Sequence, residues 1–409
     1  MQNNKITTVL YSYNLGNFNS ALLLFSVCGI FFNRYVELCI ISFCIAMLYI
    51  NKVLMIKKNF LIIFSLLFFY SSATVLINKY NYFRFIQQIF LLSIFFYCYH
   101  QIIIQHGYKT VFNNYLKLAY YVSLLGVIQF FVFLFTGKNI FFIISRRPCY
   151  PVVVGSHILR ISSILEEPSY LSAVITPAVY YYLWNHDRKN DKKRFFVLIS
   201  VFICTFSTVS YVVFFGMFLY YLSRKYKILR IIIFLGMFIL FFSLLMGHNR
   251  RLEINVSKKN VFSDIIMKVD DTVESFSDMR PQSFELLNLS TYAWTSNLWV
   301  ALNAPSRLFG TGLGTHGESY HKVYKSSFQY YGLNAYDAFS MGIRLFSEFG
   351  ILGAILFLSL FLINFNKKNI VNQATFFYIL TAILRGGNYF LYGVVFFITL
   401  YILSGRLKI

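Results

Sequence analysis

The sequence is organised around the segment from His248 to Gly353, which contains Leu308-Phe-Gly-Thr-Gly-Leu-Gly-Thr-His-Gly-Glu-Ser-Tyr320 and ends in Asn334-Ala-Tyr-Asp-Ala-Phe-Ser-Met-Gly-Ile-Arg-Leu-Phe-Ser-Glu-Phe-Gly-Ile-Leu-Gly353. This is the one long polar segment of a chain that is otherwise apolar. Its last part leads back into apolar sequence. We therefore expect a large loop outside a membrane, placed late in the chain and held by a frame of membrane helices.

The composition is that of a membrane protein. Of 409 residues, 58% are hydrophobic and 13% are charged, whereas about a quarter of the residues of a soluble domain are charged. Apolar runs of about 18 residues or more recur along the chain. Open sheet edges cannot be satisfied in hydrocarbon, so these runs must be helices. We predict an all-α, polytopic integral membrane protein.

The apolar runs predict about twelve transmembrane helices. The seventh and eighth share one run, which we divide at the polar break Thr205-Phe-Ser-Thr-Val-Ser210. A single helix there would place the basic clusters at 188–194 and 224–230 on opposite faces of the membrane. The predicted spans are 18–33, 36–51, 60–77, 83–105, 115–136, 169–184, 195–207, 209–223, 231–248, 336–363, 370–384 and 388–404.

The distribution of basic residues sets the orientation. With both termini inside, the inner loops carry nineteen Lys and Arg, and the outer segments apart from the large loop carry nine. Basic residues near span ends stay on the cytoplasmic side. We therefore predict nine spans in residues 1–248, a large outer loop at 249–335 and three spans in 336–409. The net charge of +22 then reflects topology, and no nucleic-acid partner is expected.

The cysteines predict neither a disulfide framework nor a metal site. Five of the six lie in apolar spans, and Cys149 stands alone in a polar loop. No ligand spacing typical of a metal site is present. We expect no metal and no cofactor.

A first polar cluster precedes the sixth span. It comprises Arg146 and Arg147, then Arg160 and the pair Glu166 and Glu167 before Pro168. One interpretation is local, because a Pro opens helices and carboxylates favour their positive end. The other is functional. An Arg and a carboxylate held together at the membrane boundary can bind a phosphate and activate a hydroxyl.

A second cluster is rich in glycine. Gly312, Gly314 and Gly317 match G-x-G-x-x-G, but a dinucleotide site requires this motif between a strand and a helix. Here it lies in a loop between membrane spans. The sequence predicts instead a tight turn whose backbone N–H groups approach a sugar or phosphate closely.

A third cluster lies at the head of the tenth span. Asp337 and Arg344 are seven residues apart, and Arg344 and Glu348 are four apart, so all share one helix face. A structural ion pair between Arg344 and Glu348 is one interpretation. The other is an anion site, to which Arg385 at another outer helix end contributes.

These motifs resemble the O-antigen polymerase family, which is related to the O-antigen ligases. The resemblance rests on an Arg before Glu-Pro-Ser at 167–169, a late large loop, Leu-Phe-Gly-Thr-Gly-Leu-Gly-Thr at 308–315 and Glu-Phe-Gly-Ile-Leu-Gly at 348–353. It implies a GT-C-like glycosyltransferase architecture in the bacterial inner membrane, with the large loop periplasmic. The family transfers glycans from undecaprenyl pyrophosphate without a metal. The ligases carry a His where this chain has Phe339-Ser340.

The resemblance assigns roles to the polar residues. Arg160 and Arg344 would bind the pyrophosphate. Arg146, Arg147 and Arg385 are further candidates for this role. Gly312 and Gly314 would approach the substrate. Glu167 and Asp337 are the preferred bases. His316 and His321 remain alternatives.

The resulting prediction is a polymerase that joins lipid-linked oligosaccharide repeat units. A ligase of the same family and a lipid-linked oligosaccharide flippase are the alternatives, and a non-enzymatic assembly protein is a third. Transporters hold their substrate near the midplane, whereas the charges here collect at the outer boundary. Expected partners are the undecaprenyl-pyrophosphate-linked oligosaccharide, membrane lipid and a chain-length regulator protein.

Overall fold

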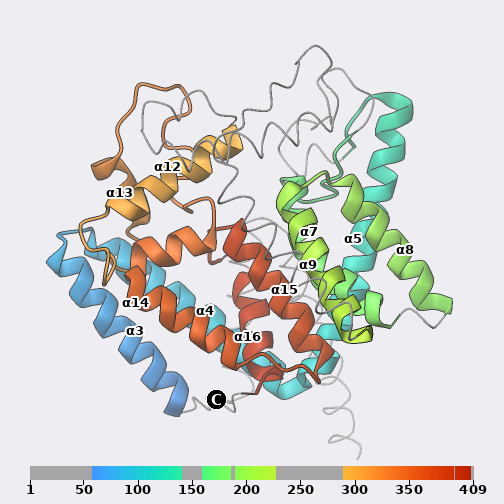
Figure 1. Cartoon of the computed structure of the whole chain (residues 1–409), viewed down its shortest axis with the longest axis horizontal. Coiled ribbons are helices and arrows are strands. Elements are labelled where there is room, and N and C mark those ends of the chain that lie inside the picture. Colours follow the sequence, from blue (N-terminus) through green and yellow to red (C-terminus); the bar gives the residue numbers. More distant parts are fainter. Residues whose placement is uncertain (1–57, 141–158, 186–188, 227–288, 391, 407–409) are drawn as a thin grey trace, which may run out of the picture.

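The computed structural model describes residues 58–140, 159–185, 189–226, 289–390 and 392–406. No β-strand occurs among these residues, and the all-α prediction is confirmed for them (Figure 1). The helices, in chain order, are α3 (Lys58–Ile77), α4 (Tyr82–His106), α5 (Tyr108–Thr136), α7 (Pro168–Trp184), α8 (Lys189–Cys204), α9 (Thr208–Lys225), α12 (Leu289–Asn303), α13 (His316–Val323), α14 (Met341–Ile363), α15 (Ile370–Leu384) and α16 (Val394–Ser404).

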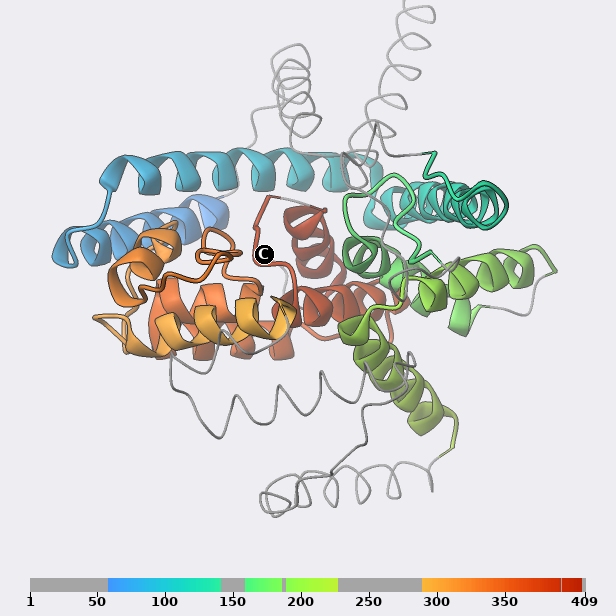
Figure 2. The same ribbon diagram turned by 90° about the horizontal axis from the view of Figure 1, so that it is seen from above.

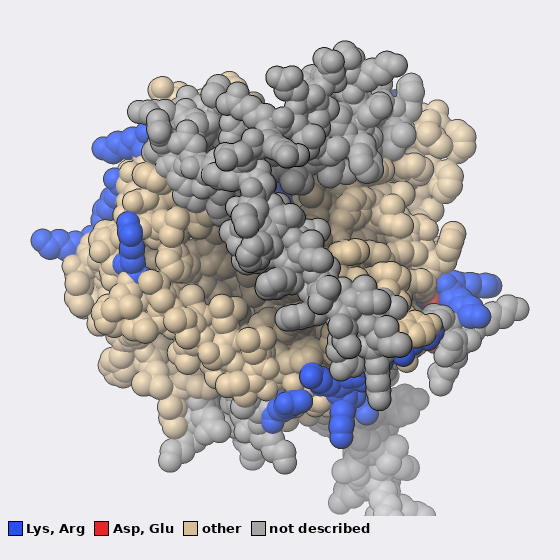
Figure 3. All heavy atoms as spheres, viewed as in Figure 1, with Lys and Arg blue, Asp and Glu red and all other residues tan. Residues whose placement is uncertain are grey.

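Three of the described helices, α4, α5 and α14, are long and apolar enough to cross a membrane. The apolar part of α3 and the helices α15 and α16 are shorter. Leu356 and Leu362 on α14 are 61% and 63% exposed, as expected of side chains that face lipid. On the face seen in Figure 3 the charged side chains stand at the margins. The predicted spans 18–33, 36–51 and 231–248 lie outside the described residues.

Helix α15 lies at the centre of the bundle. It packs against α7 and α16, and α16 packs against α4. Figures 1 and 2 show α3 and α14 on one side of this centre and α5, α7 and α8 on the other, with α4 running from the first side across to α16. Helices α12 and α13 lie across the N-terminal end of α14 (Figure 1).

The break predicted within the run 195–222 is present. Helix α8 ends at Cys204 and α9 begins at Thr208. Phe206 between them has a positive φ of 47°, a conformation that ends a helix. Arg160 donates to the carbonyls of this turn, from Nε to Thr205 O at 3.3 Å and from Nη2 to Phe206 O at 3.2 Å. A cation at a helix C-terminus stabilises its unpaired carbonyls.

Two predicted spans begin before their helices do. Helix α14 begins at Met341 instead of 336, because Asn334, Ala338 and Phe339 all have positive φ and Ser340 caps the helix through the N–H of Ile343. Helix α16 begins at Val394 instead of 388, after Gly393 at a φ of 78°. The described part of the predicted loop, residues 289–335, contains α12 and α13.

Candidate functional site

A small cleft, with about 20 Å³ open to the centres of water molecules, lies where the ends of three helices meet the head of α14. We call it the Asp337–Arg385 cleft. Its walls come from the start of α7, the end of α15, the α15–α16 connection and the segment before α14. The lining residues are Tyr170, Ala173, Asp337, Tyr378, Ala382, Arg385, Gly386, Asn388, Tyr392 and Val394.

The cleft contains an ion pair between two residues that are 218 positions apart in the sequence. Arg385 Nη2 donates to Glu167 Oε2 at 3.1 Å, and the guanidinium lies 4.5 Å from the centre of the Phe339 ring. Ser169 donates to the same carboxylate oxygen at 3.2 Å. Arg385 Nε is buried and has no hydrogen-bond partner in the structure. This arrangement holds the Arg385 guanidinium at the cleft wall, and its Nε–H donor has no acceptor.

This pair bears on the two interpretations of Glu167, local capping and a functional pairing with an Arg. Glu167 does occupy the N-cap position before Pro168, but its side chain makes no capping hydrogen bond. It pairs with an Arg, as the functional interpretation requires. The Arg is Arg385, whereas the sequence motif favoured Arg160.

Asp337 is held on the cleft by its neighbours. Its Oδ1 accepts from the N–H of Phe339 at 3.1 Å, and its Oδ2 accepts from Asn334 Nδ2 at 3.3 Å. The N–H of Gly386 donates to Phe339 O at 2.9 Å. A Cβ at Gly387 would lie 1.5 Å from Asp337 O, so only glycine fits there. The α15–α16 connection therefore runs directly along the backbone of Asp337.

Arg344 and Glu348 form the structural ion pair that was one of the two interpretations. Arg344 Nε lies 2.9 Å from Glu348 Oε1, and the two side chains are 5% and 0% exposed. Arg344 Nη1 also donates to Gly387 O at 2.9 Å. Tyr389 donates to Glu348 Oε2 at 3.0 Å, and its ring lies 4.1 Å from the guanidinium. Arg344 does not line the cleft, but it holds the α15–α16 connection that does.

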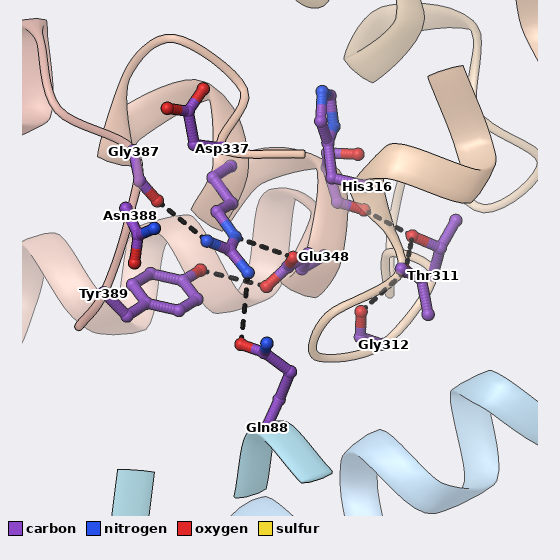
Figure 4. A network of polar contacts seen from close by, with 12 residues as sticks. Gln88, Thr311, Gly312, His316, Asp337, Glu348, Gly387, Asn388 and Tyr389 are labelled. Carbon is purple, nitrogen blue, oxygen red and sulfur yellow. Dashed lines mark hydrogen bonds and ion pairs between the residues drawn. The ribbon is translucent and has the colours of Figure 1, made fainter. Parts of the chain in front are cut away.

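Figure 4 shows how this network joins separate helices. Dashed contacts lead to Gly387 and Glu348 and to Gln88 on α4, which accepts from Arg344 Nη2 at 3.4 Å. Helices α4 and α14 and the α15–α16 connection thus meet at one buried guanidinium. Arg has donors directed to several sides in one plane, which suits such a junction.

The glycine-rich turn crosses a break in α14. Gly350 has a φ of 68° and a ψ of −167°, so the helical hydrogen bonds are interrupted there. The N–H groups of Thr311 and Gly312 donate to Ser347 O and Glu348 O, at 3.1 and 2.8 Å. A non-helical backbone inside a membrane helix requires partners of this kind.

The turn is therefore packed on α14 and does not present these N–H groups to a ligand. A Cβ at Gly312 would lie 2.3 Å from Val75 Cγ2, and one at Gly314 would lie 2.7 Å from Gln88 Cγ. On the other side of the break, the N–H groups of Ile351 and Leu352 donate to Arg307 O and Leu308 O. Gly310 and Gly350 permit this close approach of two backbones, because a Cβ at Gly310 would lie 2.5 Å from Glu348 O and one at Gly350 would lie 2.4 Å from Leu308 O.

His316 is buried away from the cleft. Its Nε2 lies 2.9 Å from Asn297 Oδ1, and its Nδ1 has no partner in the structure. Burial, with a smaller contribution from the charge of Arg344, lowers the pKa of His316 to about 3. A ring that is neutral and enclosed at ordinary pH is poorly placed to take a proton from a substrate. His321 is exposed and lies 3.1 Å from the Tyr331 hydroxyl.

Of the remaining predicted arginines, Arg160 is not among the residues that line the cleft. Arg160 is engaged by the α8–α9 turn. Arg146 and Arg147 lie outside the described residues.

Three residues that line the cleft were not predicted from the sequence. Tyr170 and Tyr392 stack with ring centres 4.1 Å apart, and Tyr392 donates to Glu166 at 3.2 Å. Asn388 also lines the cleft. The chain has 32 Tyr, so no local pattern distinguishes these two. Tyr170 lies three residues after Glu167, which was its one signal in the sequence, and Tyr392 had none.

No metal cluster is present among the described residues, where no three or more His, Cys, Asp or Glu side chains are grouped to hold an ion. Comparison with known proteins adds no constraint on the site, since no family model, curated protein or solved structure matches the chain.

Proposed function

We propose that this protein is a glycosyltransferase of the O-antigen polymerase type, which joins undecaprenyl-pyrophosphate-linked oligosaccharide repeat units. The observation that supports it is the Asp337–Arg385 cleft. A carboxylate and a guanidinium line one cavity at the ends of apolar helices, where a membrane-anchored phosphate can reach them.

The chemistry assigned to the cleft is the displacement of a pyrophosphate by a sugar hydroxyl. The bond between the anomeric carbon of the donor sugar and its pyrophosphate oxygen breaks as the acceptor oxygen bonds to that carbon. Arg385 binds the departing pyrophosphate and stabilises its developing charge. Asp337 takes the proton of the attacking hydroxyl. The leaving group is already activated, so the proposal needs no metal or cofactor.

Glu167 and Asp337 have different partners, and this difference distinguishes their roles. Glu167 is bonded to Arg385 and orients it. The structure records neutral donors to Asp337, the Phe339 N–H and the Asn334 amide. Asp337 is therefore the proposed base and Glu167 the positioning residue for Arg385.

Replacing Arg385 by Ala tests the assignment. We expect kcat/KM for transfer to fall about 10²–10³-fold, the cost of removing one preorganised charge-stabilising donor. Arg385→Lys should rescue it poorly, because a bidentate grip on phosphate is lost. The measurement is polymer formation by purified protein in lipid nanodiscs supplied with the lipid-linked repeat unit. Arg307→Ala, at an exposed arginine, is the control, and equal activity of Arg385→Ala and this control would refute the role.

The proposed topology is twelve helices with both termini cytoplasmic and residues 249–335 periplasmic. It is supported by the excess of basic residues on the inner side. We expect Ser327→Cys to react with a membrane-impermeant thiol reagent in intact spheroplasts and Lys193→Cys to stay unlabelled. Both positions are exposed in the structure, so accessibility differs by membrane side alone. The opposite labelling would reverse the orientation.

A deletion strain separates the proposed activity from its alternatives. Lipopolysaccharide capped with a single repeat unit indicates loss of a polymerase. Unsubstituted core indicates loss of a ligase or a flippase. Phe339-Ser340 at the position of the ligase His favours the first result, and in the structure Ser340 caps α14.

A further inference from the structure

Basic residues gather around the turn between α3 and α4, away from the cleft. Lys322 on α13 donates from Nζ to Lys79 O at 3.3 Å, and its Nζ lies 3.9 Å from the centre of the Tyr80 ring. Arg84, in the first turn of α4, lies 4.8 Å from the centre of the Tyr336 ring. Figure 3 shows Lys and Arg side chains at the left margin, beside the end of α3 and α13. We call Lys79, Arg84 and Lys322 the α3–α4 basic cluster.

The α3–α4 basic cluster has an excess of positive charge. Glu318 Oε1 lies 3.1 Å from Lys322 Nζ, and its Oε2 accepts from the N–H of Asn81 at 2.9 Å. Within the described part of the chain, neither Lys79 nor Arg84 forms an ion pair. Lys79 is also exposed. One carboxylate therefore accompanies three cations, and the net charge of the cluster attracts an anionic ligand.

The side chains that flank this turn are those of a membrane boundary. Leu76 and Ile77 at the end of α3 are 61% and 76% exposed, and Phe83 at the start of α4 is 78% exposed. Helix α4 is one of the described helices that are apolar enough to cross a membrane. Exposed apolar side chains of this kind contact acyl chains, and Lys and Arg at helix ends extend towards the headgroups. The cluster therefore lies at the depth of lipid phosphates.

We propose that the α3–α4 basic cluster binds the phosphate of an anionic phospholipid at the membrane surface. Lys79 and Lys322 supply ammonium donors and Arg84 a guanidinium, and both groups form charge-assisted hydrogen bonds to phosphate oxygens. Basic residues next to a membrane helix attract anionic headgroups in this way. In the proposed topology the cluster lies on the outer side, where the cytoplasmic preference of basic residues does not explain its charge. A bound headgroup links α13 and the α3–α4 turn to the bilayer.

The test measures which lipid lies next to the cluster. The reporter is Ile77→Trp, two residues before Lys79, in the full-length protein in phosphatidylcholine nanodiscs. These contain a minor fraction of either brominated phosphatidylglycerol or brominated phosphatidylcholine. Bromine quenches tryptophan fluorescence at contact, so the ratio of quenching by the two lipids reports local enrichment. The signal of the three native Trp, measured without the reporter, is subtracted. We expect about threefold more quenching by phosphatidylglycerol.

Removing the charges should remove the enrichment. Lys79→Gln should lower the quenching ratio to about half, and Lys79→Gln with Lys322→Gln should bring it close to unity. The hydrogen bonds recorded for Lys79 are those of its backbone, so the single variant leaves the fold intact. Lys79→Arg should keep the ratio, because the charge is retained. Leu356→Trp, at a 61% exposed position in the uncharged part of α14, is the matched reporter control and should give a ratio near unity.

Two results would overturn the proposal. The first is a ratio near unity for the Ile77→Trp reporter alone, or a raised ratio that persists in the double variant. The second comes from adding undecaprenyl pyrophosphate, another anionic lipid. If a trace of it abolishes the excess quenching by phosphatidylglycerol, the pyrophosphate lipid is the ligand and the phospholipid assignment is wrong. The proposed glycosyl transfer is tested separately at Arg385, so either inference can fail while the other stands.

Discussion

Asp337→Asn should lower the rate of glycosyl transfer about 10²–10⁴-fold, the usual contribution of a positioned general base. The amide has the shape of the carboxylate and can still accept from the Phe339 N–H, which donates to Asp337 at 3.1 Å. It cannot take a proton from the attacking hydroxyl. Single-turnover transfer by the purified protein measures the chemical step directly.

Two further measurements define what this result means. Binding of bare undecaprenyl pyrophosphate should be unchanged in Asp337→Asn, because Arg385 and Glu167 are intact. Asp337→Glu should retain a measurable part of the activity, since a displaced carboxylate still accepts a proton. Near-normal transfer by Asp337→Asn would remove Asp337 as the base and direct attention to Glu167.

Glu348→Gln should destabilise the protein by about 3–5 kcal/mol, the cost of leaving a buried charge without its partner. Arg344 and Glu348 are 5% and 0% exposed and lie 2.9 Å apart. Burial keeps bulk water from replacing the lost carboxylate charge. The measurement is the thermal unfolding temperature in one detergent, followed by tryptophan fluorescence.

Replacing both members of the pair separates stability from positioning. The double variant Arg344→Met with Glu348→Leu should recover most of the lost stability, because apolar residues of similar volume often replace a buried ion pair at little cost. Transfer should nevertheless stay low. The variant lacks the bond from Arg344 Nη1 to Gly387 O, which holds the connection carrying Arg385 and Asn388. A stable double variant with full activity would contradict this positioning role.

Much of the described helical frame could be predicted from short stretches of sequence. The helices α4, α5 and α14 follow from long apolar runs, and the gap between α8 and α9 follows from the polar residues at 205–210. The pair Arg344 and Glu348 follows from a spacing of four. Each of these features depends on contacts within a few turns of one helix or on the surrounding solvent.

The start of α14 illustrates where that reasoning stops. The apolar pattern extends back to residue 336, but Ala338 and Phe339 adopt positive φ, which is unfavourable for side chains with a Cβ. The neighbouring α15–α16 connection stabilises this conformation through the bond from Gly386 N to Phe339 O. A partner about fifty residues away therefore overrides the local preference.

The sequence by itself determined that the described part of the chain is helical and that several of its helices are apolar enough to lie in a membrane. Tertiary structure alone decided that Glu167 pairs with Arg385 and not Arg160, that Arg344 is buried in a junction, and that the glycine-rich turn closes the break at Gly350. The physical reason is the distance along the chain over which each effect acts. Hydropathy and helical periodicity act within a segment, whereas the partner of a buried charge or an unpaired backbone group is chosen by the packing of the whole bundle.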